Sequence, residues 1–307
     1  MSAAILELVL MTIVTAATPL IIAAIGELVT ERAGVLNLGV EGMMIVGAAL
    51  GFAAAYLSGS PLIGALAGMA AGMVLAALFG LLTIGLAINQ VAAGLALTIV
   101  GVGLSGLLGA GYVGLKRDAP PHLYIPYLSD LPFVGKLVFG QDAFVYGSFI
   151  LVAGVAWYLT RTRAGLALRA IGDNHHSAHA LGLPVRRTRF LAILFGGACA
   201  GLAGAYLSIA YTPFWSPGMT AGRGWIALAL VVFASWRPWR VVLGALLFGG
   251  ATVLQLHAQA ASLGLPGQLL SAVPYLATIA ALMVLSIGAG RRSAAPAALG
   301  QPFVAPR

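Results

Sequence analysis

Five polar side chains interrupt otherwise apolar runs in the first hundred residues: Asn37, Glu41, Asn89, Gln90 and Thr98. Burying an unpaired amide or carboxylate is unfavourable, so each of these groups should meet a partner or line a wet cavity. Such groups on an apolar wall could bind a small polar solute along a translocation path. Hydrogen bonding between helices explains the amides equally well, and a helix-end carboxylate near the membrane interface explains Glu41 equally well.

The hydrophilic segment 161–189 contains a second set of residues that could act together. Gly172 followed by Asp173 and Asn174 is typical of a turn and a helix cap. Small and apolar residues follow as far as Pro184, which would end the helix. An amphipathic segment of this kind could lie on anionic lipid.

Residues for catalysis or metal binding form no recognisable pattern. Lys116 and Lys136 are the two lysines, and both lie outside any G-x-x-x-x-G-K-[ST] loop, so the sequence contains no phosphate-binding loop. His175, His176 and His179 could hold a metal ion, but no carboxylate or thiolate completes a catalytic motif around them. We therefore expect no catalytic residue, no resident metal or cofactor, and no enzymatic activity in this chain.

The composition identifies the elements that must position these side chains. Apolar residues make up 61% of the 307 residues and charged residues only 8%, with a mean hydropathy of +1.01. A soluble domain has about 25% charged residues, whereas this apolar content fits about nine spans of about 20 residues each. We expect an all-α polytopic integral membrane protein with about 8–10 transmembrane helices, some broken or re-entrant. The apolar runs are 5–26, 33–57, 61–88, 90–115, 143–160, 190–212, 223–236, 241–261 and 270–289.

Small residues recur within these runs at helical spacing. Gly47 and Gly51 are four residues apart, as are Gly197 and Gly201, and this spacing permits close helix crossings. The single cysteine, Cys199, lies between two alanines and is expected to be a helix-packing residue. The run 223–236 is short for a full crossing, as in a broken or re-entrant helix.

The arginines predict the orientation of the spans. Segment 161–189 contains six arginines and one acid, Asp173, so the bias of basic residues places it in the cytoplasm. Nine spans then put the N-terminus outside and the C-terminus inside. Glu27 and Glu31 would lie in a short cytoplasmic turn.

The chain is expected to contain one domain. Residues 1–292 would form a single transmembrane domain, and the Ala- and Pro-rich residues 293–307 a disordered cytoplasmic tail. The net charge of +8 is explained by basic cytoplasmic loops, not by binding to nucleic acid.

Three stretches have a more specific pattern. The first, Gly26–Ala48, reads GELVTERAGVLNLGVEGMMIVGA, and the second, Ile88–Gly101, reads INQVAAGLALTIVG. The third joins Leu166–Arg189 to Ser216–Pro238, which contains GMTAGRGWIALAL. Together they resemble the permease subunits of ABC importers of the ribose and branched-chain amino acid superfamily, most closely its nucleoside and simple-sugar branch. The resemblance extends over residues 10–290.

The resemblance implies a transport subunit that does no catalysis itself. It implies a second permease that completes a heterodimer, a cytoplasmic ABC ATPase that binds ATP and Mg²⁺, and an extracytoplasmic substrate-binding lipoprotein. The substrate would be a nucleoside or a related simple sugar, and the location the inner membrane of a prokaryote. In such importers a short cytoplasmic helix docks on the ATPase, and the residues here that match it are Ala170, Gly172, Asp173, Asn174, Ala178, Leu181 and Gly182.

One detail departs from the family pattern. The family often has a glutamate after the glycine and then an Asn-Pro pair, whereas this chain has Asp173 followed by Asn174-His175. The departure weakens the transfer of individual roles to these residues.

Two residues flank the glycine-containing stretch 216–222. Trp215 and Arg223 are expected near the outer face, where they would contact the binding protein or gate the channel. An aromatic anchor at the membrane interface is the alternative for Trp215.

The functional alternative is a stand-alone secondary transporter or facilitator for a small polar solute. The sequence has no acid after Asp173, which argues against ion coupling but not against facilitated transport. A membrane-embedded enzyme is disfavoured, because no catalytic constellation lies at membrane depth.

Overall fold

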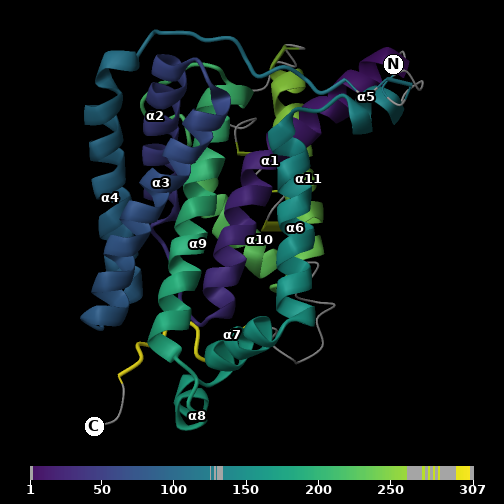
Figure 1. Cartoon of the computed structure of the whole chain (residues 1–307). Coiled ribbons are helices and arrows are strands. Elements are labelled where there is room, and N and C mark those ends of the chain that lie inside the picture. The colour runs from purple at the N-terminus through teal and green to yellow at the C-terminus, as the bar shows by residue number, and fades with distance from the viewer. Residues whose placement is uncertain are drawn as a thin grey trace.

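The computed structural model describes residues 3–124, 126–127, 129, 134–260 and 295–304, and single positions 272–273, 276, 279–280 and 283. This part of the chain is built from helices (Figure 1), which are α1 (Ala3–Arg32), α2 (Val40–Ser58), α3 (Pro61–Gly80), α4 (Gln90–Gly109), α5 (Val134–Phe139), α6 (Ala143–Arg161), α7 (Arg163–Asp173), α8 (His175–Ala180), α9 (Val185–Tyr206), α10 (Arg223–Phe233) and α11 (Pro238–Ala260). Three short segments of other helical type extend α3, α4 and α9, and they are η1 (Leu81–Gly85), η2 (Ala110–Tyr112) and η3 (Leu207–Tyr211).

Seven of the described helices are long and apolar enough to cross a membrane. They confirm the prediction of an all-α polytopic membrane protein. Helix α10 has only 11 residues, and at about 1.5 Å per residue it is too short to cross a bilayer core of about 30 Å. The predicted run 270–289 lies mostly outside the described residues.

Close helix crossings hold the centre of the bundle together. A Cβ atom at Gly47 would overlap the backbone of Gly201, one at Gly201 would overlap the carbonyl oxygen of Gly68, and one at Gly204 would overlap that of Met44. Only glycine therefore allows α2, α3 and α9 to approach so closely. Cys199 is buried in the crossing of α9 with α1, as a helix-packing residue.

The two ends of the bundle differ. Figure 1 shows α7 and α8 at one end, together with residues 295–304, and the N-terminus at the other. After α4 the chain crosses the end opposite α7 and α8, and Arg117 N there donates a hydrogen bond to Pro213 O (3.2 Å). We refer below to the α7–α8 end and the opposite end.

The prediction of a disordered tail is wrong for residues 295–304. Ala298 N donates to Gly172 O (2.9 Å), and Gly300 N donates to Gly34 O (3.2 Å). The Phe303 side chain is 5% exposed. Composition favours disorder when a segment has too little apolar surface to bury, but this segment has backbone partners on two other elements and one buried aromatic ring.

Candidate functional site

The carboxylate of Glu41, in the first turn of α2, lies at the N-terminus of α10. Its Oε1 atom accepts hydrogen bonds from Thr220 Oγ1 (2.6 Å) and Gly222 N (2.9 Å), and its Oε2 atom accepts one from Gly224 N (2.6 Å). The first N–H groups of a helix have no partner within the helix and form the positive end of its dipole. Glu41 is 7% exposed, so this buried carboxylate fixes the start of α10 against α2.

Glycines make this approach possible. Gly218 and Gly222 have φ angles of +72° and +81°, in the left-handed region that favours glycine. A Cβ atom at Gly224 would lie 2.5 Å from Cα of Glu41. The GMTAGRG stretch therefore provides the turn and the clearance that the Glu41 contact requires.

Residues 212–222 form a non-helical segment that runs alongside α2. Near its beginning, Trp215 packs against Phe52 of α2 and lies beside Gly109 at the end of α4. Near its end, Gly222 meets Glu41 in the first turn of α2. The segment thus extends from the last turns of α2 to its first.

One side of this segment is open in the isolated chain, where the exposed residues are Phe214, Pro217, Gly218 and Ala221. Irregular backbone at membrane depth is not solvated by lipid, and it occurs only where it is buried in protein or lines a water-filled cavity. The open side therefore faces either another polypeptide or a polar pathway.

Trp215 and Arg223 both contact this chain itself, and their position near the outer face stays a prediction. Trp215 is 1% exposed, so it is neither an interface anchor nor a surface contact in this structure, because Gly109 leaves room for its ring inside the bundle. Arg223 is half-buried and donates from Nη1 to Met219 O (3.1 Å). Its guanidinium lies 5.8 Å from the centre of the Tyr211 ring, so Arg223 stabilises the 212–222 segment from within.

Three predicted path residues meet at the connection between α1 and α2, residues 33–39. Gln90 Oε1 accepts from Leu36 N (2.8 Å), and Thr98 Oγ1 donates to Leu38 O (3.0 Å). Asn37 Oδ1 accepts from Gly39 N (3.0 Å). These contacts favour the interpretation as hydrogen bonds that hold the connection, and a role in the path stays a prediction.

Asn89 does not join this group. Its side chain is exposed and accepts from Ala92 N (3.1 Å) as the N-terminal cap of α4. The adjacent Gln90 is 3% exposed and faces the bundle. One helix boundary therefore gives two neighbouring amides different roles.

The prediction of a cytoplasmic turn at Glu27 and Glu31 is wrong, because both lie in the last two turns of α1 and are 1% exposed. Glu27 Oε1 accepts from Asn37 N (3.0 Å), and Glu31 Oε2 accepts from Trp236 Nε1 (2.6 Å). Their spacing of four residues places both on one helix face. The four-residue spacing could have indicated this shared face from the sequence, but no sequence pattern indicated the contact with Trp236.

The segment predicted to couple to an ATPase contains two capped helices, and we call its residues 161–184 the coupling segment. Thr162 Oγ1 accepts from Gly165 N (3.0 Å) at the start of α7, and Asn174 Oδ1 accepts from Ser177 N (3.0 Å) at the start of α8. The predicted cap is thus found at Asn174, whereas Gly172 and Asp173 belong to the last turn of α7 and form no separate turn. Gly172 lies so close to Arg32 that a Cβ atom there would overlap the Arg32 carbonyl oxygen, so α7 is held against the end of α1.

The predicted apolar face of the short helix does not form as expected. Ala178 is 3% exposed and packs against Ile171 and Val185, whereas Leu181 is 82% exposed. Helix α8 ends at Ala180, before Gly182 with a φ of +80°, and Pro184 caps α9 instead of ending α8. Of the predicted docking residues, Gly172 and Ala178 are buried, and those that are exposed are Ala170, Asp173, Asn174, Leu181 and Gly182.

The histidines of α8 form no metal cluster within the described residues. His175 is 2% exposed, and its Nδ1 atom lies 3.1 Å from Nη2 of Arg189. A guanidinium only donates, so Nδ1 accepts this hydrogen bond and the imidazole is neutral. Burial and the positive charge of Arg189 lower the pKa of His175 to about 4.

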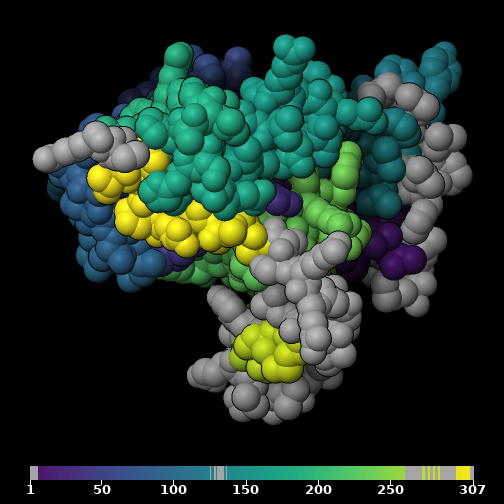
Figure 2. Space-filling model, turned by 90° about the horizontal axis from the view of Figure 1, so that it is seen from below, coloured from purple at the N-terminus to yellow at the C-terminus, as the bar shows by residue number. Residues whose placement is uncertain are grey.

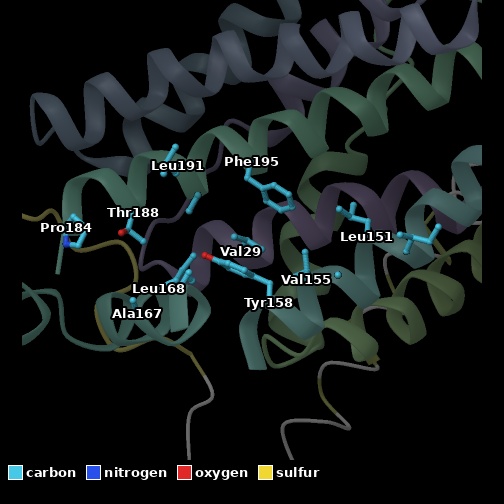
Figure 3. Close-up of a pocket in the computed structure, with 14 residues that line it drawn as sticks. Val29, Leu151, Val155, Tyr158, Ala167, Leu168, Pro184, Thr188, Leu191 and Phe195 are labelled. Atoms are coloured by element: carbon cyan, nitrogen blue, oxygen red, sulfur yellow. The ribbon is translucent and has the colours of Figure 1, made fainter. Parts of the chain in front are cut away.

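An apolar cavity of about 750 Å³ lies between α7 and the spans α6 and α9. Figure 3 shows Leu191 and Phe195 of α9 on one side and Leu168 of α7 on the other, with Tyr158 of α6 between them. Among its described lining residues, the polar side chains are Tyr158 and Thr188. A sugar or nucleoside needs more hydrogen-bonding groups than this, so the cavity does not fit such a substrate.

A second, more polar pocket of about 370 Å³ lies where the 212–222 segment begins. Its lining includes Asp142, Tyr206 and Tyr211, and Tyr206 donates from its hydroxyl to Asp142 Oδ2 (3.3 Å). Aromatic rings beside a carboxylate are the groups that bind polar ring compounds. No sequence pattern pointed to this pair, because its members are 64 residues apart.

Comparison with known proteins identifies the family to which this helical bundle belongs. The family described as branched-chain amino acid transport system / permease component matches residues 9–286. The chain belongs to this family. The protein is therefore a permease component, which agrees with the resemblance seen in its sequence.

Individual relatives of this permease are named for different substrates. It is 44% identical to TsgC13 of Haloferax volcanii, named for a glucose ABC transporter, over 94% of this chain and 95% of the relative. It is 30% identical to the guanosine ABC transporter permease NupQ of Bacillus subtilis, over 98% and 97%. The same bacterium has a second guanosine permease, NupP, which is 24% identical over 83% of this chain and 76% of its own length.

Proposed function

We propose that this permease forms half of the pathway of an ATP-driven importer for a simple sugar or nucleoside. The observation that carries the proposal is the 212–222 segment, which is irregular, open on one side and fixed by the buried Glu41 contact. Non-helical backbone at membrane depth is typical of substrate pathways in transport proteins. The open side would face the pathway where this chain meets a second permease.

The predicted partners follow from the family and the relatives. A second permease is supported by NupP and NupQ, two guanosine permeases from one bacterium that both match this chain. The ATPase, with its ATP and Mg²⁺, would dock on the coupling segment, which is exposed at Leu181 and Asp173. The substrate-binding lipoprotein would deliver substrate at the opposite end, beside the polar pocket at Tyr206.

The orientation rests on the distribution of arginines. Arg161, Arg163, Arg186 and Arg187 are exposed at the α7–α8 end, and exposed basic residues are retained on the cytoplasmic side. This end and residues 295–304 would thus lie in the cytoplasm of a prokaryote, with the permease in its inner membrane.

The test is uptake of labelled glucose and labelled guanosine by cells with and without the gene, each with the other compound as competitor. Loss of one uptake in the deletion strain, restored by the gene and dependent on cellular ATP, is the expected result. Unchanged uptake of every sugar and nucleoside would contradict the proposal. Transport by the purified chain alone in liposomes without ATP would instead support a stand-alone facilitator.

A further inference from the structure

Arg189, near the start of α9, joins three separate parts of the α7–α8 end. Its side chain is 1% exposed. Nε donates to Ala33 O (3.0 Å) and Nη1 donates to Gln301 O (3.0 Å), while Nη2 donates to His175. The planar fork of a guanidinium suits three fixed acceptors, so the α1–α2 connection, α8 and residues 295–304 are held as one unit.

Phe303 fixes the end of this C-terminal segment against α8. It packs in one cluster with Ile171, Ala178 and Val185. Its ring centre lies 5.3 Å from the ring centres of both His175 and His179. Figure 2, which views this end directly, shows residues 295–304 in yellow lying along the teal coupling segment. The segment is therefore part of the surface that α8 presents.

A groove of about 480 Å³ lies between α8 and the first turn of α9, and Phe303 forms part of its wall. Leu183, Pro184 and Val185 also line it. Arg186 and Arg187 line it as well, and both are exposed. The groove is thus apolar inside with two cations at its margin, and no acid is among its described lining residues.

Two exposed apolar residues adjoin groove-lining residues along the chain. Leu181 is 82% exposed and Val304 is 61% exposed. Leu181 comes from the coupling segment and Val304 from the C-terminal segment. An apolar patch bordered by charge is typical of a protein interaction site.

We propose that residues 295–304 are a second component of the ATPase-docking surface, beside the coupling segment. The groove that Phe303 completes would take an apolar side chain of the ATPase, and carboxylates around that side chain would pair with Arg186 and Arg187. This inference rests on the proposed function. A concave groove with cations at its margin fits such a protruding element better than it fits a flat lipid surface.

The experiment measures how much ATPase is retained by the two-permease assembly after purification in detergent, together with ATP hydrolysis by the retained enzyme. Two variants break the groove in different ways: Phe303→Ala removes its wall, and the double variant Arg186→Glu/Arg187→Glu reverses the charge of its margin. The matched control is Arg237→Glu/Arg240→Glu, which carries the same change of charge at exposed positions outside both the groove and the coupling segment.

Both groove variants are expected to retain at least tenfold less ATPase than wild type, while the control retains the wild-type amount. Recovery of the second permease with each variant shows that the assembly still folds. Equal retention in all variants would overturn the inference and leave the proposed function intact. Equal loss in the groove variants and the control would also overturn it, since general positive charge at this end would then be sufficient. A wild-type assembly that retains no ATPase would overturn the proposed function itself.

Discussion

The 33–39 connection and the 212–222 segment are both non-helical, but they differ in exposure. Both are non-helical stretches whose backbone groups are satisfied by polar side chains from distant helices. No residue of the 33–39 connection is exposed, whereas the 212–222 segment exposes Phe214, Pro217, Gly218 and Ala221. The closed stretch is therefore a joint between helices, and the open one is the surface that substrate or a second permease would meet.

The largest effect is expected when the open segment loses its anchor. Glu41→Ala removes three hydrogen bonds to one buried carboxylate. Hydrogen bonds to charged groups contribute about 1.5–3 kcal/mol each, so the free energy of unfolding should fall by several kcal/mol and uptake should be lost. Thermal unfolding of the purified assembly and cellular uptake measure the two effects.

Glu7→Ala is the control for charge, because Glu7 is partly exposed near the start of α1. It should behave as wild type. If Glu41→Ala unfolded at the wild-type temperature and transported normally, the Glu41 contact would have no part in holding the open segment.

The closed joint should respond differently. Gln90→Ala leaves the backbone N–H of Leu36 without its acceptor, and a buried unsatisfied donor costs about 1–3 kcal/mol. The unfolding temperature should fall while KM for the transported substrate stays at the wild-type value. A higher KM with unchanged stability would show instead that Gln90 lines the pathway.

A smaller effect is expected one residue earlier. Asn89→Ala removes the N-terminal cap of α4, which typically costs about 1 kcal/mol, and Asn89→Ser should restore most of it. Both variants should keep wild-type KM, because Asn89 contacts its own helix. Loss of substrate affinity in Asn89→Ala, without recovery in Asn89→Ser, would give Asn89 the path role predicted from sequence.

The smallest effect concerns pH at the α7–α8 end. The folded-state pKa of His175 is about 4, below its ordinary value of 6.5, so the unfolded chain takes up this proton first as the pH falls. The stabilising contribution is fully present above about pH 6.5 and is lost progressively toward pH 4.

His175→Asn is the matched variant, since its amide oxygen accepts from Arg189 without titrating. Between pH 7 and pH 5, wild type should lose more thermal stability than His175→Asn. This interval includes the ordinary imidazole pKa of about 6.5, at which His175 of the unfolded chain takes up its proton. Parallel loss in both proteins would show that the fold does not lower the pKa of His175.

Much of the fold follows from the sequence, because apolar length and glycine spacing are local properties. The runs that became α2, α9 and the short α10 were predicted from them. The caps at Thr162 and Asn174 are equally local, since a cap and its acceptor N–H lie three residues apart.

The candidate site could be predicted less completely from the sequence, because its contacts join residues that are distant along the chain. Glu41 was recognised as a polar group at membrane depth, but its partners at Thr220 and Gly224 are 179 and 183 residues away. Trp215 was placed at the surface because tryptophan favours membrane interfaces, and only the room left by Gly109 shows why it is buried. The position of residues 295–304 likewise depends on a distant contact, the hydrogen bond from Arg189 to the carbonyl oxygen of Gln301.

The most direct test of the open segment is the labelling of single cysteines in the assembled importer in native membranes. The chain's own Cys199 is buried, so an added cysteine reports its own surroundings. Pro217→Cys lies on the open side of the 212–222 segment, and Leu107→Cys is the control on α4, where Leu107 is 74% exposed. A thiol reacts as its thiolate, which forms in water but not in apolar surroundings.

We predict that a membrane-impermeant thiol reagent labels Pro217→Cys, that substrate slows this labelling, and that Leu107→Cys stays unlabelled. Pro217→Cys as unreactive as Leu107→Cys would contradict a water-filled pathway at this segment.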